Sequence, residues 1–177
     1  MEDSVDRLIK EHEWSDHPKL DVEVEGIVNR IDILAKYLKR SIDLTASEFR
    51  INKGEIDVLK LLRLAGKPYR LSPSRLSDRL RLSSGAMTNR LDRLESQGLV
   101  ARSADPSDRR GVVIELTDKG NEIYNSAIER QIAKENDLCS PLTADERKQL
   151  SDLLRKLTLE IESAPGFPWK SWISPEA

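Results

Sequence analysis

The chain has 177 residues, 38% of them hydrophobic and 34% charged, with a formal net charge of −2, which fits one domain with extensions and a real hydrophobic core. No apolar run approaches the roughly 18 residues of a membrane span, and the lone cysteine, Cys139, excludes an intrachain disulfide framework. We expect no secretory signal and a cytoplasmic location, because no basic segment followed by an apolar stretch opens the sequence.

Two helices are predicted in the first 46 residues. The first, over residues 3–14, carries Val5, Leu8 and Ile9 on one side and Trp14 near its end. Pro18 breaks its pattern. The second, over residues 21–46, keeps an apolar stripe at i, i+3 and i+4 spacing: Val24, Ile27, Val28, Ile31, Leu34, Ala35, Leu38 and Ile42. So long a stripe needs a partner helix, from this chain or from a second one.

The middle of the chain shows a helix-turn-helix pattern. Residues 53–65 are apolar almost all round, which predicts a central helix with Asp57 partly buried or lining a cavity. A minimal strand at 69–71 is followed by Ser72-Pro73, a capping serine with proline at the first helical position. The helix over 73–80 is then separated by a short turn from a second, basic helix that Ser83 caps.

This second helix and the hairpin predicted after it, within residues 83–120, are the centre of the organisation. Its apolar residues recur at i, i+4 and i+7, namely Met87, Leu91 and Leu94, and Gly98 suits its end. Two short apolar runs, 99–102 and 112–116, flank turn-forming residues at 105–111, which predicts a two-stranded wing. Arg109 and Arg110 at its tip suit a phosphate backbone or a minor groove better than a core.

Two more helices and a tail complete the chain. Thr117 is expected to cap a helix that runs to about Leu138, and Pro141-Leu142-Thr143 to start the last one. The last helix has a tight apolar seam of Leu150, Leu153, Leu154, Leu157 and Ile161. Residues 164–177, with three prolines, Trp169 and Trp172, are predicted to be an extended tail.

Charge is distributed unevenly along the chain. Residues 63–111 hold eleven Lys/Arg against five Asp/Glu, a net of +6, so the remainder is −8. A basic island in an acidic protein is typical of a local anion-binding face, although chance clustering on a solvated surface would give the same count.

Residues 22–162 resemble the MarR family of winged-helix transcription regulators. The sharpest match is Asp108-x-Arg110-x5-Leu116-Thr117-x2-Gly120, together with LDRLESQGLV at 91–100. The resemblance implies a mainly α, α+β winged-helix fold and a homodimer with interleaved terminal helices, whereas the periodicity alone equally allows a monomeric bundle. We accordingly divide the chain into an extra helix and linker (1–20), a helical dimerisation region (21–52 and 117–163), a winged helix-turn-helix lobe (53–116) and a tail (164–177).

Double-stranded DNA with a pseudo-palindromic operator is the expected partner, and repression the expected role. At about 100° per residue, the outward face of the recognition helix carries the polar candidates Ser84, Gly85, Thr88, Asn89 and Arg93. Arg75 in the preceding helix and Arg109 and Arg110 in the wing are candidate backbone contacts. In the family signature, Asp108 holds the wing arginine, here Arg110, by a salt bridge. The alternative is an ordinary solvated surface.

The extra first helix resembles the PecS and urate-responsive branch, which binds an anionic, purine-like ligand. The branch's ligand residues correspond here to Trp14, Asp57, Arg90 and Arg102. Arg90 lies about 60° from the centre of the apolar stripe, at the edge of the buried face, where Asp57 would be its natural partner. In this hypothesis Arg90 and Arg102 hold the anion, Trp14 stacks on it, Asp57 bonds a ring N–H, and binding attenuates DNA affinity. The alternative is a structural salt bridge between Asp57 and an arginine, with Trp14 as packing.

Other functions have weaker signals. His12 and His17 without a third ligand do not predict a metal site, and Cys139 offers only a weak case for redox sensing. A helical dimer acting purely as a protein-interaction module is a further alternative. No nucleophile–base pairing or phosphate-binding loop is present, so we expect neither catalysis nor a cofactor.

Overall fold

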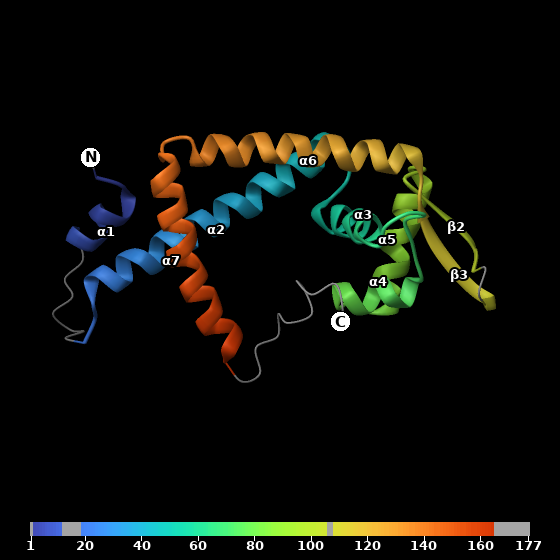
Figure 1. Cartoon of the computed structure of the whole chain (residues 1–177), viewed down its shortest axis with the longest axis horizontal. Coiled ribbons are helices and arrows are strands. Elements are labelled where there is room, and N and C mark those ends of the chain that lie inside the picture. Colours follow the sequence, from blue (N-terminus) through green and yellow to red (C-terminus); the bar gives the residue numbers. More distant parts are fainter. Residues whose placement is uncertain (1, 12–18, 106–107, 165–177) are drawn as a thin grey trace. The chain divides into compact units, whose positions relative to one another are not determined.

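The computed structural model describes residues 2–11, 19–105 and 108–164, with the side chains of residues 108–110 left out. The chain divides into two units, residues 1–44 and 45–177, and each is considered by itself. The elements in chain order are α1 (Ser4–Glu11), α2 (Val22–Glu48), α3 (Lys53–Leu64), β1 (Arg70–Leu71), α4 (Pro73–Leu80), α5 (Ser84–Ser96), β2 (Val100–Asp105), β3 (Asp108–Leu116), α6 (Asp118–Cys139) and α7 (Ala144–Ser163) (Figure 1). The predicted fold class, mainly helical with a small winged sheet, is confirmed. None of the described helices is long and apolar enough to span a bilayer.

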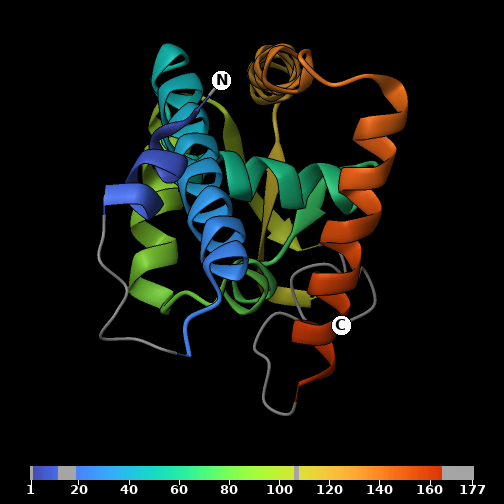
Figure 2. The same ribbon diagram turned by 90° about the vertical axis from the view of Figure 1, so that its left-hand side faces the viewer.

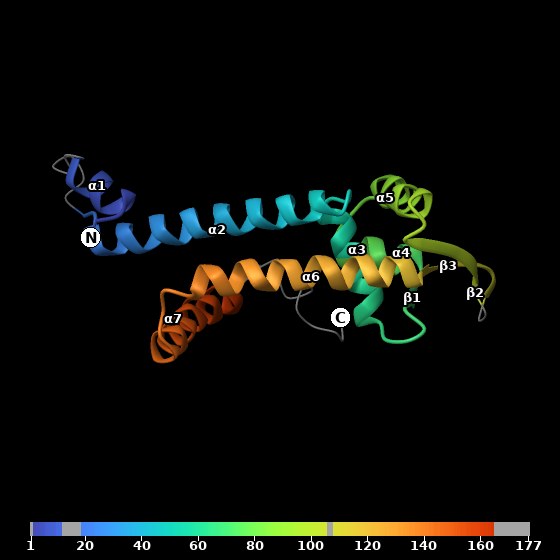
Figure 3. The ribbon, with the colours of Figure 1, turned by 90° about the horizontal axis from the view of Figure 1, so that it is seen from above.

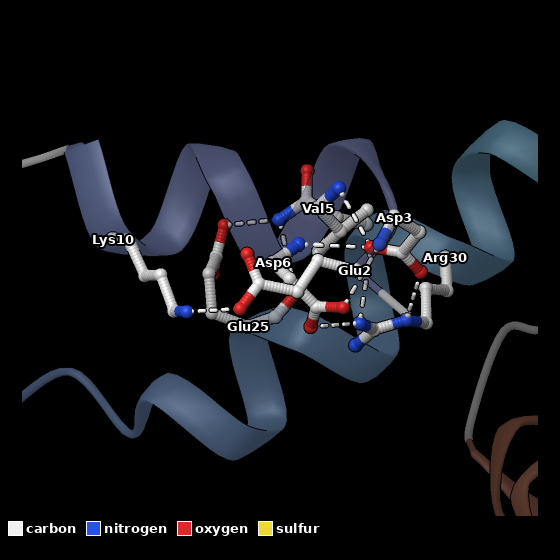
Figure 4. A network of polar contacts seen from close by, with 8 residues as sticks. Glu2, Asp3, Val5, Asp6, Lys10, Glu25 and Arg30 are labelled. Atoms are coloured by element: carbon white, nitrogen blue, oxygen red, sulfur yellow. Dashed lines mark hydrogen bonds and ion pairs between the residues drawn. The ribbon is translucent and has the colours of Figure 1, made fainter.

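In the first unit, Arg30 of α2 binds two acidic residues near the N-terminus and so holds α1 against α2 (Figure 4). Arg30 on α2 contacts Asp3 at 2.9 Å and Asp6 at 2.6 Å, and Val5 between them is buried. Hydrogen bonds from the Asp6 and Val5 backbone N–H groups and the Arg30 guanidinium hold the pKa of Asp3 below its ordinary value. Because exposed ion pairs are individually weak, the buried Val5 side chain contributes to the docking alongside them. Trp14 lies outside the described residues.

The second unit has one hydrophobic core beneath α3, α4 and α5. Its largest fully buried apolar side chains come from all three helices and from the sheet: Val58, Leu59, Leu62, Leu76, Met87, Leu91, Leu94 and Ile114. Helix α3 is central, as its apolar pattern predicted, although Leu64 at its end is exposed. Burying one side of α5 in this core fixes which side of the helix faces away.

The sheet has three antiparallel strands in the order β1-β3-β2. Strand β2 pairs with β3 from Val100 opposite Leu116 to Asp105 opposite Asp108, with an irregularity at Ala104/Asp105. Both strands continue further toward the tip than the apolar runs predicted, because backbone pairing persists through polar residues. The hairpin projects from the end of the unit that holds α4 and α5 (Figure 3). Helix α7 turns away from the axis of α6, which Figure 2 shows end-on.

The predicted helix starts at Ser72, Ser83, Thr117 and Thr143 are confirmed, because each side-chain oxygen accepts a backbone N–H from the first turn of its helix. A fifth cap, Asn52, forms a capping box with Glu55 at the start of α3. Gly98, with φ of +70°, follows the end of α5 as expected.

The junction between the wing and α6 explains the Leu116-Thr117-x2-Gly120 motif. The Thr117 hydroxyl accepts the Gly120 N–H at 3.0 Å and donates to the Gly98 carbonyl at 2.8 Å. A Cβ on Gly120 would lie 2.0 Å from the Leu99 carbonyl oxygen, so only glycine lets α6 start this close to the end of α5.

Where α2 enters the second unit, it is bound to α6 by a polar network. The Lys134 ammonium donates to Thr45 Oγ1 at 2.8 Å and to Glu48 Oε1 at 2.9 Å, and Thr45 donates to Gln131 at 3.1 Å. Thr45 and Gln131 are buried, so each needs its partner. This network ties the last turn of α2 to α6 within the second unit.

The Gly120→Ala substitution is expected to lower the free energy of unfolding by about 2 kcal/mol, because the new methyl group must push the Leu99 backbone away. Gly85→Ala is the control, since a Cβ there meets nothing within 4 Å. It should change stability by less than about 1 kcal/mol. Urea unfolding followed by circular dichroism measures both, and equal stability of the two variants would contradict the close approach at Gly120.

Candidate nucleic-acid interface

The recognition helix α5 has one buried and one exposed side, as its spacing predicted. Met87, Leu91 and Leu94 are buried in the core, whereas Ser84, Gly85, Thr88 and Asn89 are exposed. The Thr88 hydroxyl donates to the Ser84 carbonyl at 2.9 Å, which leaves its oxygen lone pairs on the exposed side. Hydroxyl and amide groups along the first two turns of a helix are suited to hydrogen bonds with phosphates and base edges.

The elements beside α5 add basic side chains to the same end of the unit. Arg75, in the first turn of α4, is exposed, and α4 packs against α5. The wing candidates Arg109 and Arg110 and their expected partner Asp108 have side chains outside the described set, so their proposed contacts stay predictions. The backbone of Asp108–Arg110 is in β3, at the tip of the hairpin.

Arg93 is exposed, as expected for a DNA contact, but it also makes an ion pair that the sequence analysis missed. Its Nε lies 2.8 Å from Glu55 Oε1, on the first turn of α3. The Glu55 side chain is 0% exposed and that of Arg93 is 63% exposed. The other carboxylate oxygen of Glu55 accepts the Asn52 N–H at 2.8 Å. The Asn52-x-x-Glu55 spacing of a capping box was readable in the sequence, but the burial of Glu55 was not.

Arg90 lies at the edge of the buried face, as its helical angle predicted, but its partner differs from the expected one. Its guanidinium donates to the Gly54 carbonyl at 3.0 Å rather than pairing with Asp57. Asp57 is 21% exposed and pairs instead with Lys53 at 2.8 Å, because residues four apart share one face of a helix. The Arg90 side chain fits here because residue 54 is glycine: a Cβ at that position would lie 2.5 Å from the guanidinium carbon.

Arg102 on β2 binds the recognition helix through two carboxylates. It contacts Asp92 at 2.6 Å and also pairs with Glu95. The hydrogen bond that Arg102 donates to Asp92 and the charge of both carboxylates raise the pKa of Arg102 above its ordinary value. These side chains are at least one-third exposed, so each pair stabilises the wing–helix contact modestly.

Of the four residues in the ligand hypothesis, the structure brings only some close to one another. Arg90 and Asp57 belong to neighbouring helices in contact, α5 and α3, but each has another partner in this structure. Arg102 is held by carboxylates on α5, and Trp14 is among the residues that are not described.

The described residues hold no cluster of three or more groups suited to a metal ion, and His12 and His17 are not among them. Cys139 is half-buried at the end of α6.

Comparison with known sequences places the chain among transcription regulators. The family model described as "MarR family" matches residues 51–112, from the residue before the α3 cap into β3. The HTH-type transcriptional regulator PecS of Dickeya dadantii is 34% identical over 146 residues, which cover 82% of this chain and 88% of PecS. The multiple antibiotic resistance protein MarR of Salmonella typhimurium is 35% identical, with 71% of this chain and 80% of that protein covered.

A solved structure supports the same relationship. A mutant MarR from E. coli, complexed with operator DNA, superposes with a TM-score of 0.58 at 31% identity, covering 76% of this chain and 95% of that one. The similar proteins with named functions are regulators rather than enzymes.

The two sides of α5 should differ sharply in stability measurements. Leu91→Ala removes a buried side chain and is expected to lower the free energy of unfolding by about 2–5 kcal/mol. Asn89→Ala, two residues away and exposed, should change it by less than about 0.5 kcal/mol. Chemical denaturation of both variants checks the assignment, and a large loss for Asn89→Ala would show that its side chain packs inside.

Proposed function

Because the chain belongs to the MarR family of transcriptional regulators, we propose that it represses transcription by binding a pseudo-palindromic operator, with α5 in the major groove. The observation that carries the proposal is the exposed polar face of α5: Ser84, Gly85, Thr88 and Asn89 lie opposite a fully buried apolar face. A helix that only faced solvent would not need α3, α4 and a hairpin packed around it. The operator complex of the related E. coli protein is consistent with this use of the fold.

Two copies of the chain are part of the proposal. Large apolar side chains are exposed along α2 and α7, including Val24, Ile27, Val28 and Ile31 on α2 and Leu150, Leu153, Leu154 and Leu157 on α7. Apolar surface of this extent is unfavourable in water and is typical of an interface. A homodimer would bury it and would present two copies of α5 to half-sites about one helical turn apart.

Two substitutions distinguish contacts with the DNA phosphate backbone from contacts that recognise the base sequence. Arg110→Ala should weaken binding to all duplexes and lower the slope of log affinity against log salt concentration by about one, because it removes a phosphate contact. Asn89→Ala should instead change the base preference at one position of the site, at a cost of about 1–3 kcal/mol for the preferred base.

The measurement is selection from a random duplex library, followed by salt titrations of binding to the selected site and to a shuffled duplex. Wild-type protein that ignores both duplexes at low ionic strength would refute DNA binding and favour the interaction-module alternative.

We further propose that a small, planar, purine-like anion lowers the affinity for the operator by recruiting Arg90. Arg90 is half-buried on the recognition helix and touches the first turn of α3, so a ligand that takes its guanidinium acts directly on α5. Asp57 is one turn from Gly54 on α3 and keeps a partly exposed carboxylate for a ring N–H. Arg102 would exchange exposed carboxylate partners for the anion, which costs little. In this proposal Trp14 stacks on the ring of the anion.

Titration of urate, xanthine and hypoxanthine into the protein–operator complex tests this proposal. At least one is expected to release DNA and to change tryptophan fluorescence, and Asp57→Asn should weaken that response tenfold or more by losing a charged hydrogen bond, worth roughly 1.5–3 kcal/mol. Asp32→Asn is the control, because Asp32 also pairs with a lysine four residues away, Lys36, on an exposed part of α2. If no purine releases DNA and fluorescence does not respond, the purine proposal is wrong, and a peroxide challenge of wild type and Cys139→Ser tests the redox alternative.

A further inference from the structure

The contact between Glu55 and Arg93 joins a fully buried carboxylate to an exposed guanidinium. Nε of Arg93 lies 2.8 Å from Glu55 Oε1, yet the N–H does not point along that line, and among the described residues no hydrogen-bond donor serves this oxygen. The contact is therefore ionic. An unpaired buried carboxylate is costly, so Arg93 provides the charge compensation for this side of Glu55.

The carboxylate itself cannot move to follow its partner. Oε2 of Glu55 accepts the Asn52 N–H at 2.8 Å, and Asn52 Oδ1 accepts the Glu55 N–H at 3.0 Å. This capping box anchors Glu55 at both its backbone and its side chain. Arg93 is thus held by a rigid group rather than by a flexible surface side chain.

The shape of the guanidinium group determines which nitrogens of Arg93 remain able to contact DNA. Its donors form a planar fork, and contact through Nε leaves both terminal Nη groups without a partner among the described residues. Arg93 is one turn beyond Asn89, on the exposed side of α5 that is proposed to enter the groove. An acceptor on the duplex would meet an arginine that is already oriented.

We infer that Glu55 is a positioning residue for DNA binding: its charge holds Arg93 by an ionic contact at Nε, which leaves the Nη groups free to face a phosphate of the duplex. The inference rests on the proposed function of α5. Arg93 then makes the DNA contact, and Glu55 acts only through it. A phosphate at the Nη groups adds a second anion to one cation, and orienting that cation beforehand lowers the entropic cost of binding.

The test compares full-length variants on two duplexes, one selected from a random library by the wild-type protein and one shuffled. Arg93→Gln should weaken binding to both about tenfold and lower the salt slope by about one, the loss of one phosphate contact. Glu55→Gln keeps a side chain able to cap α3 but loses the charge that orients Arg93, so its salt slope should fall in the same direction. The double variant should match Arg93→Gln alone, because Glu55 has no contact of its own with DNA.

Arg93→Lys keeps the charge but has one ammonium, which cannot lie against Glu55 through one nitrogen while two other nitrogens face a phosphate. We expect its salt slope to resemble that of Arg93→Gln. Should Glu55→Gln fail to fold, Arg93→Lys and Arg93→Gln decide the question by themselves. Glu146→Gln is the matched control: Glu146 is the capping-box glutamate of α7, is exposed, and within the described part of the chain its carboxylate bonds only Thr143. Its salt slope should equal that of wild type.

An unchanged salt slope in Arg93→Gln would show that Arg93 does not reach DNA and would overturn the inference. A lowered slope in Arg93→Gln with wild-type behaviour in Glu55→Gln would show that Arg93 acts without Glu55, and this also overturns it. A wild-type protein that binds neither duplex would instead refute the proposed function, so the two failures are distinguishable.

Discussion

The burial of one face of α5 is the constraint from which the rest of the interface follows. Met87, Leu91 and Leu94 lie in a core shared with α3, α4 and the sheet, and burying side chains of this size contributes about 1.5–3 kcal/mol each. Rotating α5 by even one residue would expose part of this set. The orientation of Thr88 and Asn89 is therefore set by residues that never meet DNA.

Three arginines, Arg90, Arg93 and Arg102, connect α5 to neighbouring elements through contacts of different strength. Arg102 binds two exposed carboxylates, which are screened by solvent and readily exchanged. Arg90 bonds a backbone carbonyl at the start of α3, and Arg93 faces the buried carboxylate one residue further along. Of these three arginine contacts, the two at the first turn of α3 are therefore less screened by solvent than the contacts of Arg102 with Asp92 and Glu95.

Local patterns predicted the elements well, whereas the polar contacts between elements were not accessible from sequence. The caps at Ser72, Ser83, Thr117 and Thr143 follow from single side chains next to apolar runs, and the burial of Met87 and Leu91 follows from helical spacing. Asp57 pairs with Lys53 rather than with an arginine of another helix, because Lys53 lies four residues away on the same helix face. The pairing of Glu55 with Arg93 depends on how α3 crosses α5, which no local pattern contains.

Helix α7 supports the proposed homodimer. None of its 20 residues is buried, and an isolated helix of that length gains little stability from propensity alone. Its leucines at Leu150, Leu153, Leu154 and Leu157 occupy one face, so the missing burial must come from another surface. If that surface is the equivalent region of a partner, folding of α7 and pairing of two α5 helices are one equilibrium. Operator affinity then depends on protein concentration, because only paired chains present two α5 helices to the duplex.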